Sequence, residues 1–310
     1  MPTSIRAPDL HVKPIPLTEE SFHQFGTVIQ NPARNPDNPT TNRVVSANQG
    51  SALKYIDVTH LTNHYTRAPS RKDARPVMNM FVSSPRKLRQ QQNGEKVFDV
   101  EIMERHPYTP QTFIPLGLPK DSTTKYLVIV APTLPYSEAS TSNSPNLSSF
   151  TNSSPTLAKQ QNGIQTDRET ASKTLSTFTN SSPALAKSQS KLAKTQTSPS
   201  PNPFTISSTR SRAQSRLLET QALSLTDSWP RGPGLPDLSN VRAFLADGSQ
   251  AITYGAGTWH APMIVLGDRE VDFVVVQWAN GVAGEDCQEV VLDGGKLEVG
   301  LGGGGLKARL

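Results

Sequence analysis

The sequence has 310 residues, and only 35% of them are hydrophobic, which is less than folded domains usually contain. We therefore expect part of the chain to remain unfolded. The single cysteine, Cys287, excludes an intrachain disulfide framework, and we interpret it as a small buried side chain without chemistry. No uncharged apolar run is long enough to span a bilayer, so we expect a cytoplasmic protein without a membrane partner.

The formal net charge of +5 is concentrated in one part of the chain. Nine basic and five acidic residues lie between positions 136 and 228, a surplus of four, which leaves a surplus of about one elsewhere. Because the basicity belongs to one polar tract and not to a folded surface, the charge argues against a nucleic-acid partner.

Residues 1–135 carry mainly strand signals. A short helix is expected first, with Thr18 as its N-cap and Gly26 as its C-terminal stop. Strands are expected to follow at 27–29, 43–45, 53–58, 77–82, 96–105, 112–116 and 126–130.

The clearest of these strands is 96–105, because its apolar residues alternate with polar ones. This alternation places the apolar side chains of Phe98, Val100 and Ile102 on one face, and Glu104 and His106 continue that face. Arg105 falls on the opposite face, where a surface or interface ion pair is expected.

Residues 136–228 are rich in Ser, Thr, Asn, Gln, Pro and Lys and poor in aromatic residues. Apolar burial could not offset the entropy of ordering such a tract, so we expect a disordered insertion. Strand signals return in residues 229–293, where the apolar run 271–278 predicts a strand that is buried on both faces. The glycine-rich residues 294–310 are expected to form a mobile tail.

Many short strands with Pro and Gly between them indicate an all-β sandwich or barrel. Neither block has many strands alone, so residues 1–135 and 229–293 are expected to form one β-barrel domain that the insertion interrupts.

The best candidate for a functional turn is the segment 254–262, in which glycines and a proline closely specify the backbone around His260. A second set, Glu104, His106 and Gln111, has the spacing Glu-x-His-x4-Gln at the end of one strand and the start of the next. This spacing is similar to the cupin pattern, in which such residues and a later histidine line the interior of a jelly-roll barrel. Two imidazoles, an amide oxygen and a carboxylate can hold a divalent metal or can act as base and hydrogen-bond donors without one.

Several segments, in the same order and spacing, resemble the ureidoglycolate lyase family, also called ureidoglycolate hydrolase, and its fungal branch in particular. The resemblance covers both blocks and leaves out the insertion and the tail. It is carried by residues 16–26, Asn48-Gln49-Gly50, Glu104-Arg105-His106-Pro107, 111–115, Arg242-Ala243-Phe244, 257–262 and 271–276.

The resemblance implies a cupin-like barrel, commonly a homodimer, that splits (S)-ureidoglycolate into glyoxylate and urea in allantoin catabolism. His260 is the candidate base, because imidazole as a class titrates near neutral pH. His106 and Glu104 are candidates for proton transfer or for holding a metal. A divalent metal, if bound, would be held by His106, Gln111 and His260, and no organic cofactor is expected.

Five side chains are candidates for binding the substrate. Either Arg242 or Arg105 could bind the substrate carboxylate through two hydrogen bonds. Tyr254 and Gln111 could orient the substrate, or could be packed residues with satisfied polar tips. Asn48 is included because it lies in one of the matching segments.

Two other functions are compatible with the same residues. One is a cupin-fold metal-dependent hydrolase that releases ammonia from a ureido compound. The other is a non-catalytic regulator that binds a small molecule, in which residues 136–228 are the working part.

Overall fold

Strands make up most of the regular structure in the part of the chain that the computed structural model describes, which comprises residues 3–34, 43–135 and 232–302. The predicted all-β class is therefore confirmed. The tract 136–228, for which the sequence predicts disorder, lies outside the described residues. Within those residues, no helix is long and apolar enough to cross a bilayer.

Three sheets and one separate hairpin contain all the strands of the described segments. The eight-stranded sheet has the order β1 (Thr3–Arg6), β18 (Gln288–Asp293), β10 (Ile102–Arg105), β15 (Trp259–His260), β12 (Lys125–Ala131), β13 (Arg242–Ala246) and β3 (Ile15–Pro16), and β16 (Ile264–Leu266) also pairs with β12. The five-stranded sheet has the order β4 (Gly26–Gln30), β14 (Gln250–Tyr254), β11 (Gln111–Leu116), β17 (Val271–Ala279) and β7 (Arg75–Ser83). The four-stranded sheet has the order β2 (Leu10–Val12), β19 (Leu297–Gly300), β9 (Lys96–Asp99) and β8 (Arg89–Gln90). The hairpin consists of β5 (Val44–Ala47) and β6 (Ala52–Tyr55).

The helical elements are single turns. They are the α-helices α1 (Glu19–Phe22) and α4 (Ala283–Asp286) and the 3-10 turns η1 (Pro32–Arg34), η2 (Asn48–Gly50), η3 (Tyr65–Arg67) and η6 (Leu238–Asn240).

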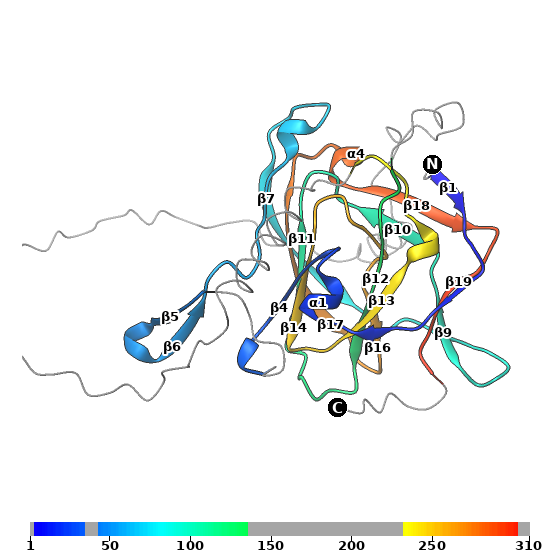
Figure 1. The fold of residues 1–310 in the computed structure, drawn as a ribbon, viewed down its shortest axis with the longest axis horizontal. Helices are drawn as coiled ribbons and strands as arrows, with labels where there is room; N and C mark the ends of the chain where they lie inside the picture. Colours follow the sequence, from blue (N-terminus) through cyan, green and yellow to red (C-terminus); the bar gives the residue numbers. More distant parts are fainter. Residues whose placement is uncertain (1–2, 35–42, 136–231, 303–310) are drawn as a thin grey trace, which may run out of the picture. The chain divides into compact units, whose positions relative to one another are not determined.

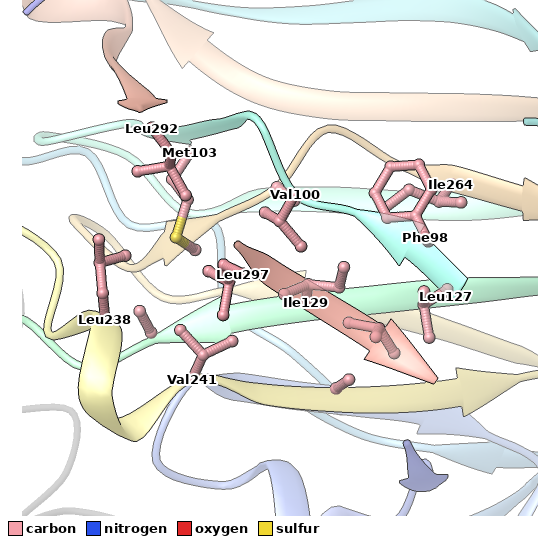
Figure 2. Close-up of a cluster of buried hydrophobic side chains, with 14 of the residues drawn as sticks. Phe98, Val100, Met103, Leu127, Ile129, Leu238, Val241, Ile264, Leu292 and Leu297 are labelled. Carbon is pink, nitrogen blue, oxygen red and sulfur yellow. The ribbon is translucent and has the colours of Figure 1, made fainter. Parts of the chain in front are cut away.

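The eight-stranded sheet forms the middle layer, because both of its faces are buried. On one face, Leu127 and Ile129 of β12 pack with Phe98 of β9 and Leu297 of β19, in a cluster that we call the first core (Figure 2). On the other face, alternate β12 residues pack against the five-stranded sheet in the second core. Figure 1 shows β12 and β13 between β14 and β17 on one side and β9 and β19 on the other.

Strands from the two sequence blocks pair with one another in both the eight-stranded and the five-stranded sheet. β10 pairs with β15, β12 pairs with β13, and β11 lies between β14 and β17. Both blocks therefore build one cupin-like arrangement of facing sheets, and each sheet has edge strands within the described residues.

The first helix forms where the sequence predicts it, but it ends earlier. The Thr18 hydroxyl accepts a hydrogen bond from the Ser21 amide at 3.1 Å, and the Ser21 hydroxyl accepts one from the Thr18 amide at 3.3 Å, which makes a capping box. The helix ends at Phe22, so the expectation that Gly26 stops it is wrong. Gly26 instead begins β4, where an added Cβ would lie 1.8 Å from the Thr253 carbonyl oxygen.

The predicted strand 96–105 is divided between two sheets. β9 belongs to the four-stranded sheet and β10 to the eight-stranded sheet, and at the break the Val100 amide donates to the Leu297 carbonyl. After the break Met103 is the fully buried residue, and Ile102 is only half-buried. The alternation alone could not reveal this change of sheet, because apolar residues occur on both sides of the break.

Two other predictions about strands need correction. β17 buries Val271, Phe273 and Val275 on one face, but Asp272 on its other face is exposed, so the strand is not buried on both faces. The ordered block also extends past residue 293, because β19 pairs with β2 and β9 and buries Leu297 in the first core.

Candidate functional site

The turn before β15 directs His260 between the eight-stranded and the five-stranded sheets. Gly257 has a φ of 78°, and its amide donates to the His106 carbonyl at 2.8 Å, which ties this turn to the end of β10. Because successive side chains of a strand point to opposite faces, Trp259 enters the first core while His260 lies on the face of the second core. Both side chains are almost completely buried.

The two site histidines have the same tautomer. The Nδ1 atom of His260 donates to the Thr258 carbonyl at 2.9 Å, and that of His106 donates to the Asp286 carbonyl at 2.6 Å. A carbonyl oxygen can only accept, so in each neutral ring Nδ1 carries the proton and Nε2 has a free lone pair. Both Nε2 atoms are buried without a hydrogen-bond partner among the described residues.

Glu104 lies beside both histidines. It is directly opposite His260 in the pairing of β10 with β15, and its Oε1 is 3.6 Å from His260 Nε2. Burial by itself would raise the pKa of the Glu104 carboxyl, but the adjacent His260 and, after it, His106 outweigh this effect, so the pKa is lowered. Burial, followed by the charge of His260, lowers the pKa of His106. At neutral pH the site therefore contains a carboxylate next to a neutral His106.

The five-stranded sheet supplies the opposite wall. The Tyr254 ring stacks on the His260 ring with centroids 3.9 Å apart, and Gln111 is the cross-strand neighbour of Tyr254. Gln111 donates from Nε2 to Gln277 Oε1 at 2.7 Å. The Tyr254 hydroxyl and Gln111 Oε1 are buried without a partner within the described segments, and burial raises the pKa of Tyr254 so that the hydroxyl stays a donor. Buried polar atoms of this kind normally have partners, so this set is suited to a polar ligand.

The donor set also fits a divalent metal ion. One ligand atom each from Glu104, His106 and His260 lies within 4.8 Å of the others, and two of these atoms are the unpartnered Nε2 lone pairs. Imidazole and carboxylate ligands suit several first-row metals. The structure thus groups Glu104 with the two histidines and places Gln111 across the site on the other sheet.

Comparison with known proteins identifies the family. The family model described as ureidoglycolate lyase matches residues 9–299. The chain belongs to the ureidoglycolate lyase family. The ureidoglycolate lyase of Schizosaccharomyces pombe is 25% identical over 88% of this chain and 86% of its own length. The ureidoglycolate lyase of Saccharomyces cerevisiae is 26% identical over 84% of this chain and 82% of its own length. The ureidoglycolate lyase of Brucella anthropi is 32% identical over 39% of this chain and 58% of its own length.

The two arginines proposed for the substrate carboxylate have different environments in this member of the ureidoglycolate lyase family. Arg242 is exposed and lies on the site face of the middle sheet, since it is the neighbour of Val130, which is itself the neighbour of His260. Arg105 lies on the opposite face of β10, with its guanidinium carbon 4.6 Å from the centre of the Trp259 ring.

The expected surface or interface ion pair at Arg105 is wrong, because this residue is only 2% exposed. Its guanidinium donates to Gln288 Oε1 and to the carbonyls of Gly232, Pro233 and Gly234, and burial lowers its pKa to about 10. Arg105 thus anchors the start of the second block and does not reach His260.

Asn48 is not brought to the site within one copy of the chain. It is exposed in the turn of the β5–β6 hairpin, where Asn48 and Gln49 have φ values of 50° and 53°. The structure therefore gives no contact between Asn48 and the histidines.

Sequence reasoning missed three site residues of this ureidoglycolate lyase family member. Gln277 is a polar residue in an apolar strand, on the same face as Val275, and this pattern could have revealed it. Cys287 contacts the site, because its Sγ is 3.9 Å from Glu104 Oε2, and burial, then the Glu104 charge, raises the pKa of the thiol, which therefore stays protonated. Asp286 contributes a backbone carbonyl, which no residue-type pattern could predict.

Proposed function

We propose that this protein is a ureidoglycolate lyase that cleaves (S)-ureidoglycolate into glyoxylate and urea in allantoin catabolism. The observation that carries the proposal is the pair of buried, unpartnered Nε2 atoms of His106 and His260 beside the Glu104 carboxylate. The family match over residues 9–299 supports the choice of substrate. A cytoplasmic location is part of the proposal, and the scarcity of cysteine is consistent with it.

The first step in this proposal is removal of the substrate hydroxyl proton by Nε2 of His260. The hydroxyl, the carboxylate and the ureido nitrogen are attached to one carbon, so the oxygen electron pair can form the carbonyl of glyoxylate as the C–N bond breaks. Glu104 stabilises the resulting imidazolium, because its Oε1 lies 3.6 Å from that nitrogen.

The second step is protonation of the departing urea. The electron pair of the broken C–N bond stays on the ureido nitrogen, which takes the proton from the His260 imidazolium, and His106 assists this transfer. No proton is gained or lost overall. Tyr254 and Gln111 offer a hydroxyl donor and an amide oxygen to orient the ureido group.

Arg242 is the proposed partner of the substrate carboxylate. Its place in the cross-strand row Arg242, Val130, His260 puts it two strands from the base, a backbone separation of about 10 Å. The long Arg242 side chain can span part of this distance and bind the substrate carboxylate through two parallel hydrogen bonds. Arg105 is unsuited to this role because carbonyl oxygens on the other face occupy its donors.

A metal ion in this site would be held by Glu104, His106 and His260. When bound, it would polarise substrate oxygens as a Lewis acid. Dialysis against a chelator, followed by metal analysis of the protein and addition of single divalent ions, tests whether urea release requires a metal ion.

The experiment that tests the function uses purified protein and racemic ureidoglycolate with divalent metals supplied. We expect urea and glyoxylate to be released in equal amounts from no more than half of the substrate. Release of ammonia in place of urea would contradict the lyase assignment and favour a hydrolase.

We also propose that the protein is a homodimer. The outer face of the five-stranded sheet exposes five large apolar side chains, Met78 (71%), Met80 (55%), Val82 (57%), Ile114 (37%) and Leu116 (45%). The register places them on one face across β7, β17 and β11. The exposed Asp272 shares this face, between Val82 and Leu116. A group of exposed apolar side chains with a polar residue among them is typical of an interface, and an isologous contact would cover it on both copies.

The homodimer is tested by light scattering coupled to size-exclusion chromatography. Met80→Glu should convert the dimer to a monomer, whereas Leu134→Glu, at an exposed position outside this face, should leave it intact. A wild-type mass of one chain would contradict the proposal.

A further inference from the structure

One short segment, residues 285–289, contacts the last two residues of β10 and the residue that follows it. Cys287 lies against Glu104, Gln288 accepts from Arg105, and the Asp286 carbonyl accepts from His106. Two of these three residues, Glu104 and His106, belong to the candidate site. The conformation of this segment therefore affects the orientation of the Glu104 and His106 side chains.

Three hydrogen-bond donors hold the Asp286 carboxylate in place. Its carboxylate accepts from the Tyr65 hydroxyl at 2.7 Å, from the Asn280 amide at 2.9 Å and from the Gly281 amide at 2.8 Å. Its own amide donates to the Val282 carbonyl at 2.8 Å. Backbone and side chain are both fixed, so the carbonyl that meets His106 has little freedom to turn.

Of the three donors to the Asp286 carboxylate named above, Tyr65 is the one that donates from its side chain. It belongs to η3, which is far away in sequence, and its ring is 2% exposed. The hydroxyl is also 3.2 Å from the Trp278 carbonyl, so it lies between the end of β17 and the segment 285–289. Tyr65 thus connects the loop before β7 to the turn that holds His106.

We propose that Tyr65 and Asp286 are positioning residues that fix the tautomer and ring orientation of His106, so that its Nε2 lone pair faces Glu104 and His260. Only the expected effect on turnover rests on the proposed function. The hydrogen-bond geometry itself exists without substrate. For imidazoles that bind a metal, loss of such an orienting partner typically lowers metal affinity or activity by about 10- to 100-fold, and we expect an effect at the lower end of this range here.

The experiment compares wild-type protein with Tyr65→Phe by nitrogen NMR of 15N-histidine-labelled, full-length protein. The chain has six histidines, and the signals of His106 and His260 are assigned with His106→Gln and His260→Gln. Nitrogen shifts distinguish the Nδ1–H tautomer from the Nε2–H tautomer. In wild type we expect the Nδ1–H form alone at both positions.

In Tyr65→Phe we expect a measurable fraction of the Nε2–H tautomer at His106 and none at His260, whose Nδ1 is held independently by Thr258. Tyr108→Phe is the matched control, because it removes a tyrosine hydroxyl from a ring only 5.7 Å away from Tyr65. Asp286→Asn is a second variant. The Gly281 amide donates to one carboxylate oxygen of Asp286, and in asparagine an NH2 group, which is a donor, can take the place of that acceptor.

An unchanged His106 signal in both Tyr65→Phe and Asp286→Asn would overturn the proposal. A change at His260 as large as that at His106 would also overturn it, because it would indicate a general loosening. With ureidoglycolate, kcat of Tyr65→Phe should fall about tenfold while KM changes less. If the wild type does not turn over ureidoglycolate, only the proposed function fails, since the tautomer is measured without substrate.

Discussion

Tyr254 lies flat on His260, with ring centroids 3.9 Å apart and an angle of 12° between the planes. The two residues come from different sheets, so this contact closes the site from the side of the five-stranded sheet. The stacked ring fixes the plane of the imidazole, while the hydroxyl at its tip has no partner among the described residues.

The Tyr254 hydroxyl provides the first prediction. Tyr254→Phe keeps the stacked ring and removes only a buried hydroxyl that has no protein partner, so we expect no loss of thermal stability. If the hydroxyl binds substrate, kcat/KM should fall about tenfold, the equivalent of about 1.4 kcal/mol. Tyr126→Phe is the control, because its buried hydroxyl donates to the Gln250 carbonyl away from the histidines. Unchanged kinetics in Tyr254→Phe would exclude the hydroxyl from substrate binding.

The carboxylate of Glu104 provides the second prediction. Glu104→Gln keeps the shape of the side chain but removes the charge that stabilises the His260 imidazolium, so kcat should fall by about 100-fold. Glu101→Gln, at an exposed position three residues earlier, should have no effect on kcat. Steady-state kinetics on both variants makes the comparison, and equal rates would contradict the role of Glu104.

Acidification should lower the free energy of unfolding through His106. Its pKa is lowered in the folded protein by burial and by His260, so below about pH 6.5 the unfolded chain takes up the proton first. The stabilisation is complete above that pH and is lost progressively as the pH falls toward the folded-state pKa. Glu104, whose pKa is also lowered, acts in the same direction at lower pH.

Urea unfolding at pH 7.5 and pH 5.5 measures this dependence. The decrease in the free energy of unfolding between the two values should be smaller in His106→Gln than in wild type. An identical decrease in both proteins would show that His106 does not contribute.

The three central residues of the candidate site follow from the sequence. The pattern around Glu104 and His106 and the glycine turn before His260 are local signals, and the structure brings these three residues together. The expectation for Arg105 failed because its environment depends on carbonyls at 232–234, which are distant in sequence and carry no side-chain signal.

The change of sheet at Val100 could not be predicted for a related reason. Alternation specifies which side chains share a face of one strand, but it does not specify which neighbours that strand pairs with. The role of Asp286 toward His106 was hidden because a backbone carbonyl has the same chemistry in every residue.

Arg105 provides a prediction about stability. Arg105→Lys should lower the free energy of unfolding by about 3 kcal/mol, because a lysine ammonium cannot satisfy the planar set of four acceptors. Arg86→Lys is the control, since that guanidinium also lies over an aromatic ring but is exposed. A difference below about 0.5 kcal/mol between the two variants would mean that the Arg105 contacts do not stabilise the fold.

The most direct test of the account is the initial rate of urea release from ureidoglycolate by His260→Ala, measured beside wild type in the presence of divalent metals. Because this histidine is the proposed base, the rate should fall by at least about 100-fold while the circular dichroism spectrum stays that of wild type. A folded His260→Ala protein that releases urea at a rate within about threefold of wild type would contradict the assignment of His260 as the base.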